Sequence, residues 1–388
     1  MSSGKYHILF LTRWYPNRYD VQLGIFIQKH AQAVAQYCNV SVLYVQAVKG
    51  LKKNVEIEEI VVNEVKELRI YYKAHSLRMF NYLKYVIWHL KGYKRLNSNG
   101  AKIDLIHLHV MFGLGLICRL LSKIYNKPYM VTEHWHGFTD GQFEHKSNWF
   151  KIDIYKTAFQ AKAFTAVSGY LKKALEKNGF KNPIEIIPNV VEISGESLNK
   201  SSEGVWRFLT VADLLDKVKN ISSVIEVMQE IMHELPGQKI EYHIIGGGID
   251  EVDLKALAHK EKRYLDTIIF HGRQTNDYVL DFIQKCNCSI INSTTETFSV
   301  FAAESLLSGI PVISTKCGGP EEFLDETNSI LIEIKDKSAL KQSIYAVIQG
   351  KKLFDAEIIK ASAGKKFEMQ TIGNQFYKIY SKILNRKY

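Results

Sequence analysis

The sequence predicts an α/β protein made of two doubly wound, Rossmann-like parallel-sheet domains that face one cleft. Its 388 residues exceed what a single hydrophobic core usually supports. Short apolar runs alternate with helical patterns twice over, and this alternation is typical of parallel sheets. A polar stretch at residues 196–204 separates the two series. We therefore expect an N-terminal domain at residues 1–194, a linker at 195–204 and a C-terminal domain at 205–370.

The expected strands are apolar runs bounded by polar or glycine-containing turns. In the first domain they cover residues 7–12, 40–45, 68–72, 105–110, 129–134, 163–168 and 184–188. In the second domain they cover residues 208–212, 242–246, 267–272, 288–293, 311–315 and 329–334. Within residues 371–388, an apolar stripe at helical spacing predicts a C-terminal helix with one buried face; its members are Phe376, Ile379, Tyr380 and Ile383.

Composition favours a globular protein of the cytoplasm. The chain is 46% hydrophobic and 12% aromatic, which is ample for two cores. No apolar run approaches the 18 residues of a membrane span, and the run at residues 8–11 lacks the flanks of a signal peptide. The five cysteines form no Cys-x2-Cys zinc pair, so we expect reduced structural thiols.

The net charge of +11 is unevenly distributed. Residues 1–190 contain 27 Lys and Arg against 13 Asp and Glu, a net charge of +14, and the remainder contains 24 against 27, a net charge of −3. Basic and aromatic residues are interleaved between Lys66 and Arg95, a mixture that suits an anionic membrane surface. We expect either peripheral membrane contact there or core aromatics beside solvated lysines. No nucleic-acid-binding module accompanies the charge, so nucleic acid is not an expected partner.

Glu296 and Glu304 carry the clearest functional signal. Between them, Ser299 is a suitable helix N-cap, residues 300–307 contain no helix breaker, and Gly309 follows. Eight helical residues span roughly 12 Å, so one extended ligand can meet both carboxylates while its anionic centre lies near the helix N-terminus. A nucleoside diphosphate sugar has that shape. The alternative is two solvated glutamates on a surface helix.

This segment resembles the nucleotide-sugar site of the retaining glycosyltransferases of family 4. The matching positions are Glu296, Phe298, Glu304, Gly309, Pro311, Val312, Gly318 and Gly319. Thr297 and Ser299 replace the glycines usual beside the phenylalanine. The likeness covers nearly the whole chain, including the opening segments at residues 14–16 and 24–27 and the turn at residues 187–189. It implies the GT-B architecture, in which the C-terminal helix crosses back onto the first domain; packing within the second domain is the alternative.

The resemblance also implies roles for individual side chains. Glu296 would bind hydroxyls of the transferred sugar and Glu304 the ribose diol, since a carboxylate can accept two hydrogen bonds from a vicinal diol. His134 matches the histidine that faces the transferred sugar, and His136 is its local competitor. Histidines that follow a strand in this class of sheet lie where ligands bind.

The diphosphate-binding residues match the family only in part. Lys219 resembles the family's diphosphate lysine, and Lys217 is a rival in the same loop. Asp213 stands where the family usually has arginine, so the expected second cation is missing. Either Lys217 replaces it, or Lys219 and the backbone amides of residues 298–300 neutralise the phosphates.

Further contacts are expected from glycines and strand ends. Gly246 belongs to a triplet like the family's Gly-x-Gly turn, and Gly272 with Arg273 follows the strand expected near the base. Gly24 would let the first loop approach the phosphates or the acceptor closely. The expected catalytic residues are His134, Glu296 and Lys219. The expected donor-binding residues are Glu304, Phe298, Ser299, Val300, Lys217, Gly272, Arg273 and Gly246.

No metal or other cofactor is expected. The chain contains no Asp-x-Asp sequence, no His-x3-His pair and no Gly-x-Ser-x-Gly elbow. We predict a retaining, metal-independent transferase that moves a hexose-type sugar from a UDP- or GDP-sugar to a sugar or lipid-linked acceptor, in surface polysaccharide or glycolipid biosynthesis. Asp213 suggests one alternative, a non-catalytic nucleotide-sugar-binding subunit. A second alternative is a GT-B relative with other chemistry, such as an epimerase.

Overall fold

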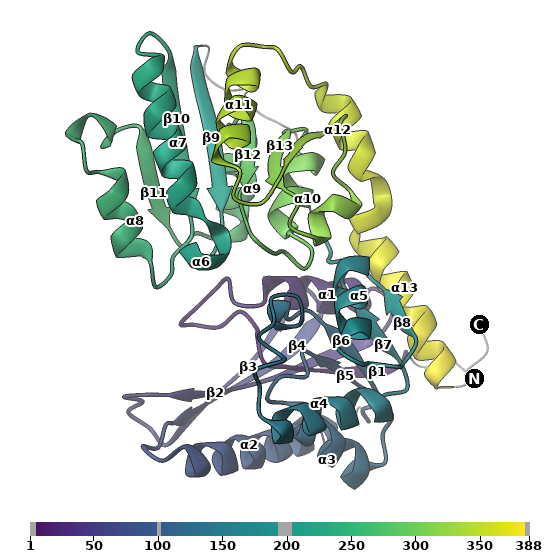
Figure 1. Ribbon diagram of the computed structural model, residues 1–388. Helices are drawn as coiled ribbons and strands as arrows, with labels where there is room; N and C mark the ends of the chain where they lie inside the picture. The colour runs from purple at the N-terminus through teal and green to yellow at the C-terminus, as the bar shows by residue number, and fades with distance from the viewer. Residues whose placement is uncertain (1–4, 99–101, 193–203, 385–388) are drawn as a thin grey trace. The chain divides into compact units, whose positions relative to one another are not determined.

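The structure, a computed structural model, describes residues 5–98, 102–192 and 204–384 and divides into two compact units (Figure 1). Unit 1 comprises residues 1–190 and 367–388, and unit 2 comprises residues 191–366. The expected linker lies outside the described residues except for Gly204.

Unit 1 is built on an eight-stranded sheet of order β3-β4-β2-β1-β5-β6-β7-β8. Its strands are β1 (His7–Thr12), β2 (Asn39–Val48), β3 (Val55–Val62), β4 (Val65–Lys73), β5 (Leu105–His109), β6 (Tyr129–Glu133), β7 (Phe164–Ala166) and β8 (Ile184–Ile186). All neighbours pair in parallel except β3 and β4. The strand order reverses between β1 and β5, and the loops that follow these strands diverge there.

Strand β3 is absent from the sequence-based prediction. It forms an antiparallel hairpin with β4 through Asn63 and Glu64, whose φ angles are 46° and 65°. Positive φ at both central residues is what a two-residue type I′ turn requires. The usual signal for this turn is Asn-Gly or Asp-Gly, and Asn-Glu does not provide it.

The helices of unit 1 are α1 (Ile25–Ala35), α2 (Arg78–Ser98), α3 (Gly115–Tyr125), α4 (Asn148–Gln160), α5 (Gly169–Lys177) and α13 (Met369–Ile383), with a short 3-10 turn η1 (His136–Phe138). In Figure 1, α2, α3 and α4 cover the sheet face opposite α1. Helix α13 packs along α1, and its apolar stripe enters the same core as Ile8, Phe10 and Ile27. A Cβ on Gly373 would lie 2.2 Å from the carbonyl oxygen of Ala33, so glycine permits this close approach.

Unit 2 is built on six parallel strands of order β11-β10-β9-β12-β13-β14. They are β9 (Val205–Val211), β10 (Lys239–Ile245), β11 (Ile268–Gly272), β12 (Cys288–Ile291), β13 (Val312–Thr315) and β14 (Ser329–Ile332). The strand order is that of a doubly wound nucleotide-binding sheet and reverses between β9 and β12. Each expected strand of this half is present within a few residues of its predicted bounds.

The helices of unit 2 are α6 (Asp216–Lys219), α7 (Ile221–Glu234), α8 (Glu251–Ala258), α9 (Asn276–Ile283), α10 (Val300–Leu307), α11 (Lys337–Ile348) and α12 (Ala356–Ala363). The 3-10 turns are η2 (Lys262–Tyr264), η3 (Gly319–Glu322) and η4 (Gly364–Phe367). Helix α11 packs on α7, which packs on α8, and α12 packs on α10. Within the described parts of both units, no helix combines the length and the apolar character that a membrane crossing requires.

Candidate active site

The predicted donor residues of unit 2 lie at the carboxyl edge of its sheet, where the strand order reverses. The loop after β9 carries Asp213 and leads into α6, and the loop after β12 carries Glu296 and leads into α10. The loop after β12 is joined to α6 by a hydrogen bond of 2.8 Å from the amide of Thr294 to the carbonyl of Val218. Open parallel sheets bind ligands in the crevice at this position.

Two predicted catalytic residues, 77 positions apart in the chain, meet at this edge. The Lys219 ammonium group donates to Glu296 Oε1 over 2.5 Å, and the hydroxyl of Ser293 donates to the same oxygen over 2.7 Å. Burial alone lowers the pKa of Lys219, but attraction to Glu296 and then to Asp213 outweighs it, so the net shift is upward. Lys219 is therefore a fixed positive charge at neutral pH, held in place by a carboxylate.

The loop that carries Glu296 is pinned on both sides by backbone hydrogen bonds. The amide of Glu296 donates to the carbonyl of Cys317, and the amide of Gly319 donates to the carbonyl of Glu296, both over 2.8 Å. A Cβ on Gly319 would lie 2.4 Å from the carbonyl oxygen of Thr297. The glycine turn at residues 318–319 thus fixes the backbone of the donor loop.

Helix α10 begins and ends where the sequence predicts. Its N-cap is Ser299, whose hydroxyl accepts from the amide of Ala302 over 3.3 Å. Ser299 has φ 67° and ψ 87°, a left-handed conformation that favours glycine. This conformation gives a physical reason for the glycine that the resembled family usually has at this position.

The carboxylates at the two ends of this segment are not solvated surface charges. Glu304 on α10 is 4% exposed, and the side chain of Glu296 is 15% exposed. This burial counts against the alternative of two solvated glutamates on a surface helix. Phe298 is buried and its ring packs against Phe323, and Val300 is half-buried at the helix start.

Asp213 forms an ion pair with a second predicted donor residue. Arg273, which follows β11, places Nη2 3.1 Å from Asp213 Oδ1 and 3.0 Å from the carbonyl oxygen of Gly247. The structure therefore places the Arg273 guanidinium, from the end of β11, beside Asp213.

The glycine triplet after β10 supports this arrangement by packing. A Cβ on Gly246 would lie 1.8 Å from the carbonyl oxygen of Ala212, and one on Gly248 would lie 2.4 Å from that of Leu214. Both contacts are with the loop that carries Asp213, which therefore lies directly on the end of β10. Gly272, with φ 66°, ends β11 and turns the chain toward Arg273.

The structure distinguishes the two rival lysines of α6. Lys219 points to Glu296, whereas Lys217 is exposed and its ammonium makes no ion pair with Glu296. Of the two, Lys219 is the lysine built into the carboxyl edge of the sheet.

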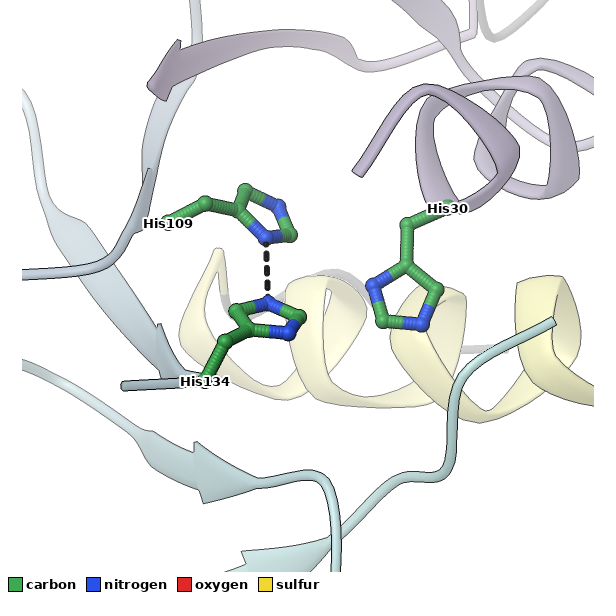
Figure 2. Close-up of side chains that lie close together, drawn as sticks. All are labelled: His30, His109 and His134. Atoms are coloured by element: carbon green, nitrogen blue, oxygen red, sulfur yellow. Dashed lines mark hydrogen bonds between the residues drawn. The ribbon is translucent and has the colours of Figure 1, made fainter. Parts of the chain in front are cut away.

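In unit 1, His134 directly follows β6 and is 5% exposed. Its Nε2 lies 3.2 Å from Nδ1 of His109, and its Nδ1 is buried without a hydrogen-bond partner among the described residues (Figure 2). His136, the local competitor, has a side chain that is 42% exposed and lies 3.7 Å from Asp140. That His134 contacts the transferred sugar stays a prediction. The side chain of His134 is buried in this conformation, which counts against such a contact.

Sequence reasoning missed the partners of His134. His30 comes from α1 and His109 from the end of β5, and both are fully buried beside it. His107, two residues earlier on β5, bonds Thr132 Oγ1 and the hydroxyl of Tyr380 on α13, both over 2.7 Å. The only local signal is the His-x-His spacing on β5, because the other members come from distant segments.

Glu133 ties together the loops that follow β5 and β6. Its carboxylate accepts from the backbone amides of Met111, His134 and Trp135 over 3.1, 2.9 and 2.9 Å. Burial raises the pKa of Glu133 to about 7, and the three donors only partly offset this. Its role is to position the loop that contains His134.

Gly24 has a structural explanation. It is the N-cap of α1 with φ 67°, and a Cβ there would lie 2.4 Å from the carbonyl oxygen of Trp14. The requirement for glycine therefore comes from packing within the loop between β1 and α1, and close approach of a ligand is not needed to explain it.

Comparison with known proteins agrees with this geometry. The model of "Glycosyltransferase Family 4" matches residues 27–194, and that of "Glycosyl transferases group 1" matches residues 198–363. An uncharacterized glycosyltransferase of Methanocaldococcus jannaschii is 29% identical over 75% of this chain and 78% of its own length. The N-acetylgalactosamine-N,N'-diacetylbacillosaminyl-diphospho-undecaprenol 4-alpha-N-acetylgalactosaminyltransferase of Campylobacter jejuni is 24% identical over 89% of this chain and 95% of its own.

Solved structures show the same fold at lower sequence identity. Sucrose-phosphate synthase from Thermosynechococcus elongatus superposes with a TM-score of 0.78 at 15% identity, covering 99% of this chain and all of that one. Anabaena HepE in complex with UDP and glucose superposes with a TM-score of 0.74 at 18% identity, covering 97% of this chain and all of that one. With matches to both family models along nearly its whole length, the chain belongs to the glycosyl transferases of group 1 and is a glycosyltransferase of the GT-B fold.

Proposed function

We propose that the protein is a retaining, metal-independent glycosyltransferase that moves a hexose-type sugar from a UDP- or GDP-sugar to a saccharide or lipid-linked acceptor. The observation that carries the proposal is the Lys219–Glu296 pair at the carboxyl edge of the unit 2 sheet, together with the burial of Glu304 on α10. The Campylobacter relative, whose name specifies a diphospho-undecaprenol-linked saccharide, supports a lipid-linked acceptor and a place in surface polysaccharide or glycolipid biosynthesis.

In this proposal the Lys219–Glu296 pair changes partners when the donor binds. The diphosphate takes the Lys219 ammonium group in a charge-assisted contact, which releases Glu296 Oε1 to accept from sugar hydroxyls. As the bond between the sugar and the diphosphate breaks, negative charge grows on the diphosphate, and a cation already in place stabilises it without rearrangement. The acceptor hydroxyl must be held on the face that the leaving group vacates, where its oxygen bonds the sugar carbon and its proton passes to the departing diphosphate.

Arg273 is the proposed second cation of the diphosphate site. It stands at the same sheet edge, anchored by Asp213 and the carbonyl of Gly247. Asp213 also raises the pKa of Lys219, although less than Glu296 does. Lys219 and Arg273 therefore both lie within the electrostatic reach of the Asp213 carboxylate. Asp213 thus positions Arg273 instead of opposing the diphosphate, which compensates for the arginine that the family usually has at residue 213. Two cations and the N-terminus of α10 then take the place that a metal ion has in other transferases.

The donor site can be tested with binding and transfer measured separately. Titration calorimetry with UDP and GDP is expected to show at least about a tenfold loss of affinity in Lys219→Met, because a charge-assisted contact is removed. Glu304→Ala is expected to weaken nucleotide binding and transfer together, whereas Glu296→Gln should abolish transfer and spare nucleotide binding. Lys217→Met is the matched control and should retain wild-type affinity.

Two results would contradict the donor site. If Lys217→Met and Lys219→Met lose equal affinity, the assignment of the diphosphate to Lys219 is wrong. Nucleotide affinity unchanged in Glu304→Ala would remove the ribose assignment. Transfer activity that disappears in EDTA at a temperature where the EDTA-treated protein stays folded would refute metal independence. Nucleotide binding with neither hydrolysis nor transfer of any sugar nucleotide would favour a non-catalytic subunit.

We further propose that unit 1 contacts an anionic membrane through α2. The helix exposes Met79 (73% exposed), Phe80 and Leu83 together with the basic Arg78 and Lys91. Apolar and aromatic side chains can enter the headgroup region while nearby cations meet anionic lipid. Sequence alone left open whether the aromatics of this stretch belong to the core. Tyr71, Tyr72 and Tyr93 are buried, whereas Phe80 and Tyr82 are exposed and favour a surface role for α2.

Vesicle flotation tests this contact. The full chain is expected to float with vesicles that contain phosphatidylglycerol at low salt and to stay unbound with phosphatidylcholine alone. Met79→Ser with Leu83→Ser should reduce flotation, while Val252→Ser, an equally exposed position on unit 2, should not. Absence of flotation at low salt on anionic vesicles would overturn the membrane proposal and leave the donor site untouched.

A further inference from the structure

Three histidines from separate segments of unit 1 converge in its interior. His30 lies on α1, His109 ends β5 and His134 follows β6. One ring nitrogen of each lies within 4.8 Å of those of the other two, and all three side chains are buried. Figure 2 shows the ring of His30 directed toward the His109–His134 pair.

The ring nitrogens of this cluster are incompletely satisfied by the protein. His30 Nε2 bonds the carbonyl oxygen of Pro188 over 3.0 Å, and one hydrogen bond joins His109 Nδ1 to His134 Nε2. His30 Nδ1, His109 Nε2 and His134 Nδ1 are buried and have no hydrogen-bond partner among the described residues. A buried polar atom without a partner costs about 1–3 kcal/mol. Of the three, His30 Nδ1 is the atom that a ligand between the rings would satisfy, because His109 Nδ1 and His134 Nε2 are the nitrogens that face each other.

The arrangement of these nitrogens suits a metal ion. Two nitrogens bound to one tetrahedral Zn²⁺ at about 2.0–2.1 Å are about 3.4 Å apart. His109 Nδ1 and His134 Nε2 are 3.2 Å apart, close to that spacing. Metal-ligating histidines commonly donate their other ring N–H to a carbonyl or a carboxylate, as His30 Nε2 does to Pro188. That bond leaves the lone pair of His30 Nδ1 for a ligand.

The chemistry of the donor set selects the kind of ion. Imidazole nitrogens suit Zn²⁺, Co²⁺, Ni²⁺ and Cu²⁺, whereas Mg²⁺ and Ca²⁺ prefer oxygen. Burial lowers the pKa of each of the three rings, which keeps them in the neutral form that binds metals. The buried Glu133 is an acidic group next to the cluster, and its carboxylate accepts from the amide of His134.

We propose that His30, His109 and His134 form a binding site for a divalent transition-metal ion, of which Zn²⁺ is the representative, with a structural role in unit 1. The ion would tie α1 to the carboxyl ends of β5 and β6. It would bring His30 closer to the other two rings and replace the hydrogen bond between His109 and His134. The site belongs to unit 1 and involves none of the donor residues of unit 2, so it is compatible with metal-independent transfer. A His134 that binds metal is not available to a sugar.

Metal binding to the full chain tests the proposal directly. After EDTA treatment and desalting, Zn²⁺ is expected to bind at one ion per chain and to raise the thermal unfolding temperature. Co²⁺ is expected to give the visible absorption of a tetrahedral or five-coordinate nitrogen site. His30→Gln and His109→Gln should each lose about tenfold or more in affinity and lose the Zn²⁺-dependent thermal shift. His89→Gln is the control, because His89 is also fully buried in unit 1 but lies outside the cluster.

Two results of these binding measurements would overturn the metal site. No stoichiometric Zn²⁺ or Co²⁺ binding by the wild type overturns the proposal, as does equal affinity in His30→Gln and the wild type. If the variants fail to fold, X-ray absorption of the Zn²⁺-loaded wild type decides instead. Three imidazole ligands would support the site, and a shell of oxygen or sulfur ligands would overturn it.

Discussion

Ser299 combines an unfavourable backbone conformation with a place in the predicted donor-binding loop. It adopts a left-handed backbone to start α10 beside Glu296, and the cost for a residue other than glycine is about 1 kcal/mol. Strain of this kind persists where surrounding contacts impose it, and here the backbone bonds of Glu296 to Cys317 and Gly319 do so.

Replacing Ser299 by glycine is expected to stabilise the protein. The substitution relieves the left-handed strain, and glycine is only a few tenths of a kcal/mol worse than serine as an N-cap. Thermal unfolding should therefore show a gain of about 0.5–1 kcal/mol. Ser308→Gly, at the other end of the helix with φ −82°, is the control and should give no gain. A loss of stability in Ser299→Gly would mean that its hydrogen bond to Ala302 outweighs the strain.

Asp213 and Arg273 should matter for binding and little for folding. Both side chains are substantially exposed, and exposed ion pairs contribute about 0–1 kcal/mol to stability. Arg273→Gln is expected to leave the unfolding temperature nearly unchanged while weakening UDP or GDP binding by about tenfold, the effect of one lost charge-assisted contact. Asp213→Asn should give a smaller loss of the same kind. Unchanged nucleotide affinity in Arg273→Gln would show that Lys219 carries the diphosphate alone.

At the scale of elements, the docking of α13 on α1 depends on Gly373. Gly373→Ala would place a methyl group 2.2 Å from the carbonyl oxygen of Ala33, which forces the two helices apart. Alanine favours a helix by about 1 kcal/mol over glycine, but overpacking against backbone costs about 1–3 kcal/mol. Chemical denaturation should therefore show net destabilisation. Gly237→Ala, where a Cβ meets no atom within 4 Å, is the control and should be close to neutral.

The elements themselves were largely predictable, with one informative failure. Helix α10 was predictable at both ends because a capping serine and a glycine mark it locally. Strand β3 was not, because its turn uses Asn63 and Glu64 without the glycine that usually signals it. The packing partner of α13 was also open, since an apolar stripe shows that a face is buried without showing what covers it.

At the scale of the molecule, buried histidines predict sensitivity to acid. Burial lowers the pKa of His30 and His89 to about 4, and it also lowers the pKa of His107, His109 and His134. These groups protonate in the unfolded chain near pH 6.5 but resist protonation when folded. Their contribution to stability is therefore complete above pH 6.5 and is lost as the pH falls toward 4. Glu133 acts in the opposite direction, because its raised pKa favours folding at low pH and that contribution is lost as the pH rises through about 7.

Because five histidines outnumber one carboxyl, we expect the free energy of unfolding to fall below pH 6.5. Each neutral buried histidine contributes a slope of about 1.4 kcal/mol per pH unit. Urea unfolding of the EDTA-treated, metal-free protein at pH 7.5, 6.5 and 5.5 measures this slope, and His89→Gln should reduce it by the share of one histidine. A free energy of unfolding that is flat between pH 7.5 and 5.5 would contradict the prediction.

Local signals in the sequence were enough to predict the two parallel-sheet units and the bounds of α10, with Glu296 before this helix and Glu304 within it, because apolar periodicity and helix caps act locally. Tertiary structure decided which lysine meets Glu296, that Arg273 joins Asp213, that α13 packs on α1, and that His30, His109 and His134 converge. These contacts join residues between 25 and more than 300 positions apart, and such distances are set by strand order and helix packing. A residue type at one position shows which chemistry it can offer. Only the fold shows which partner it meets.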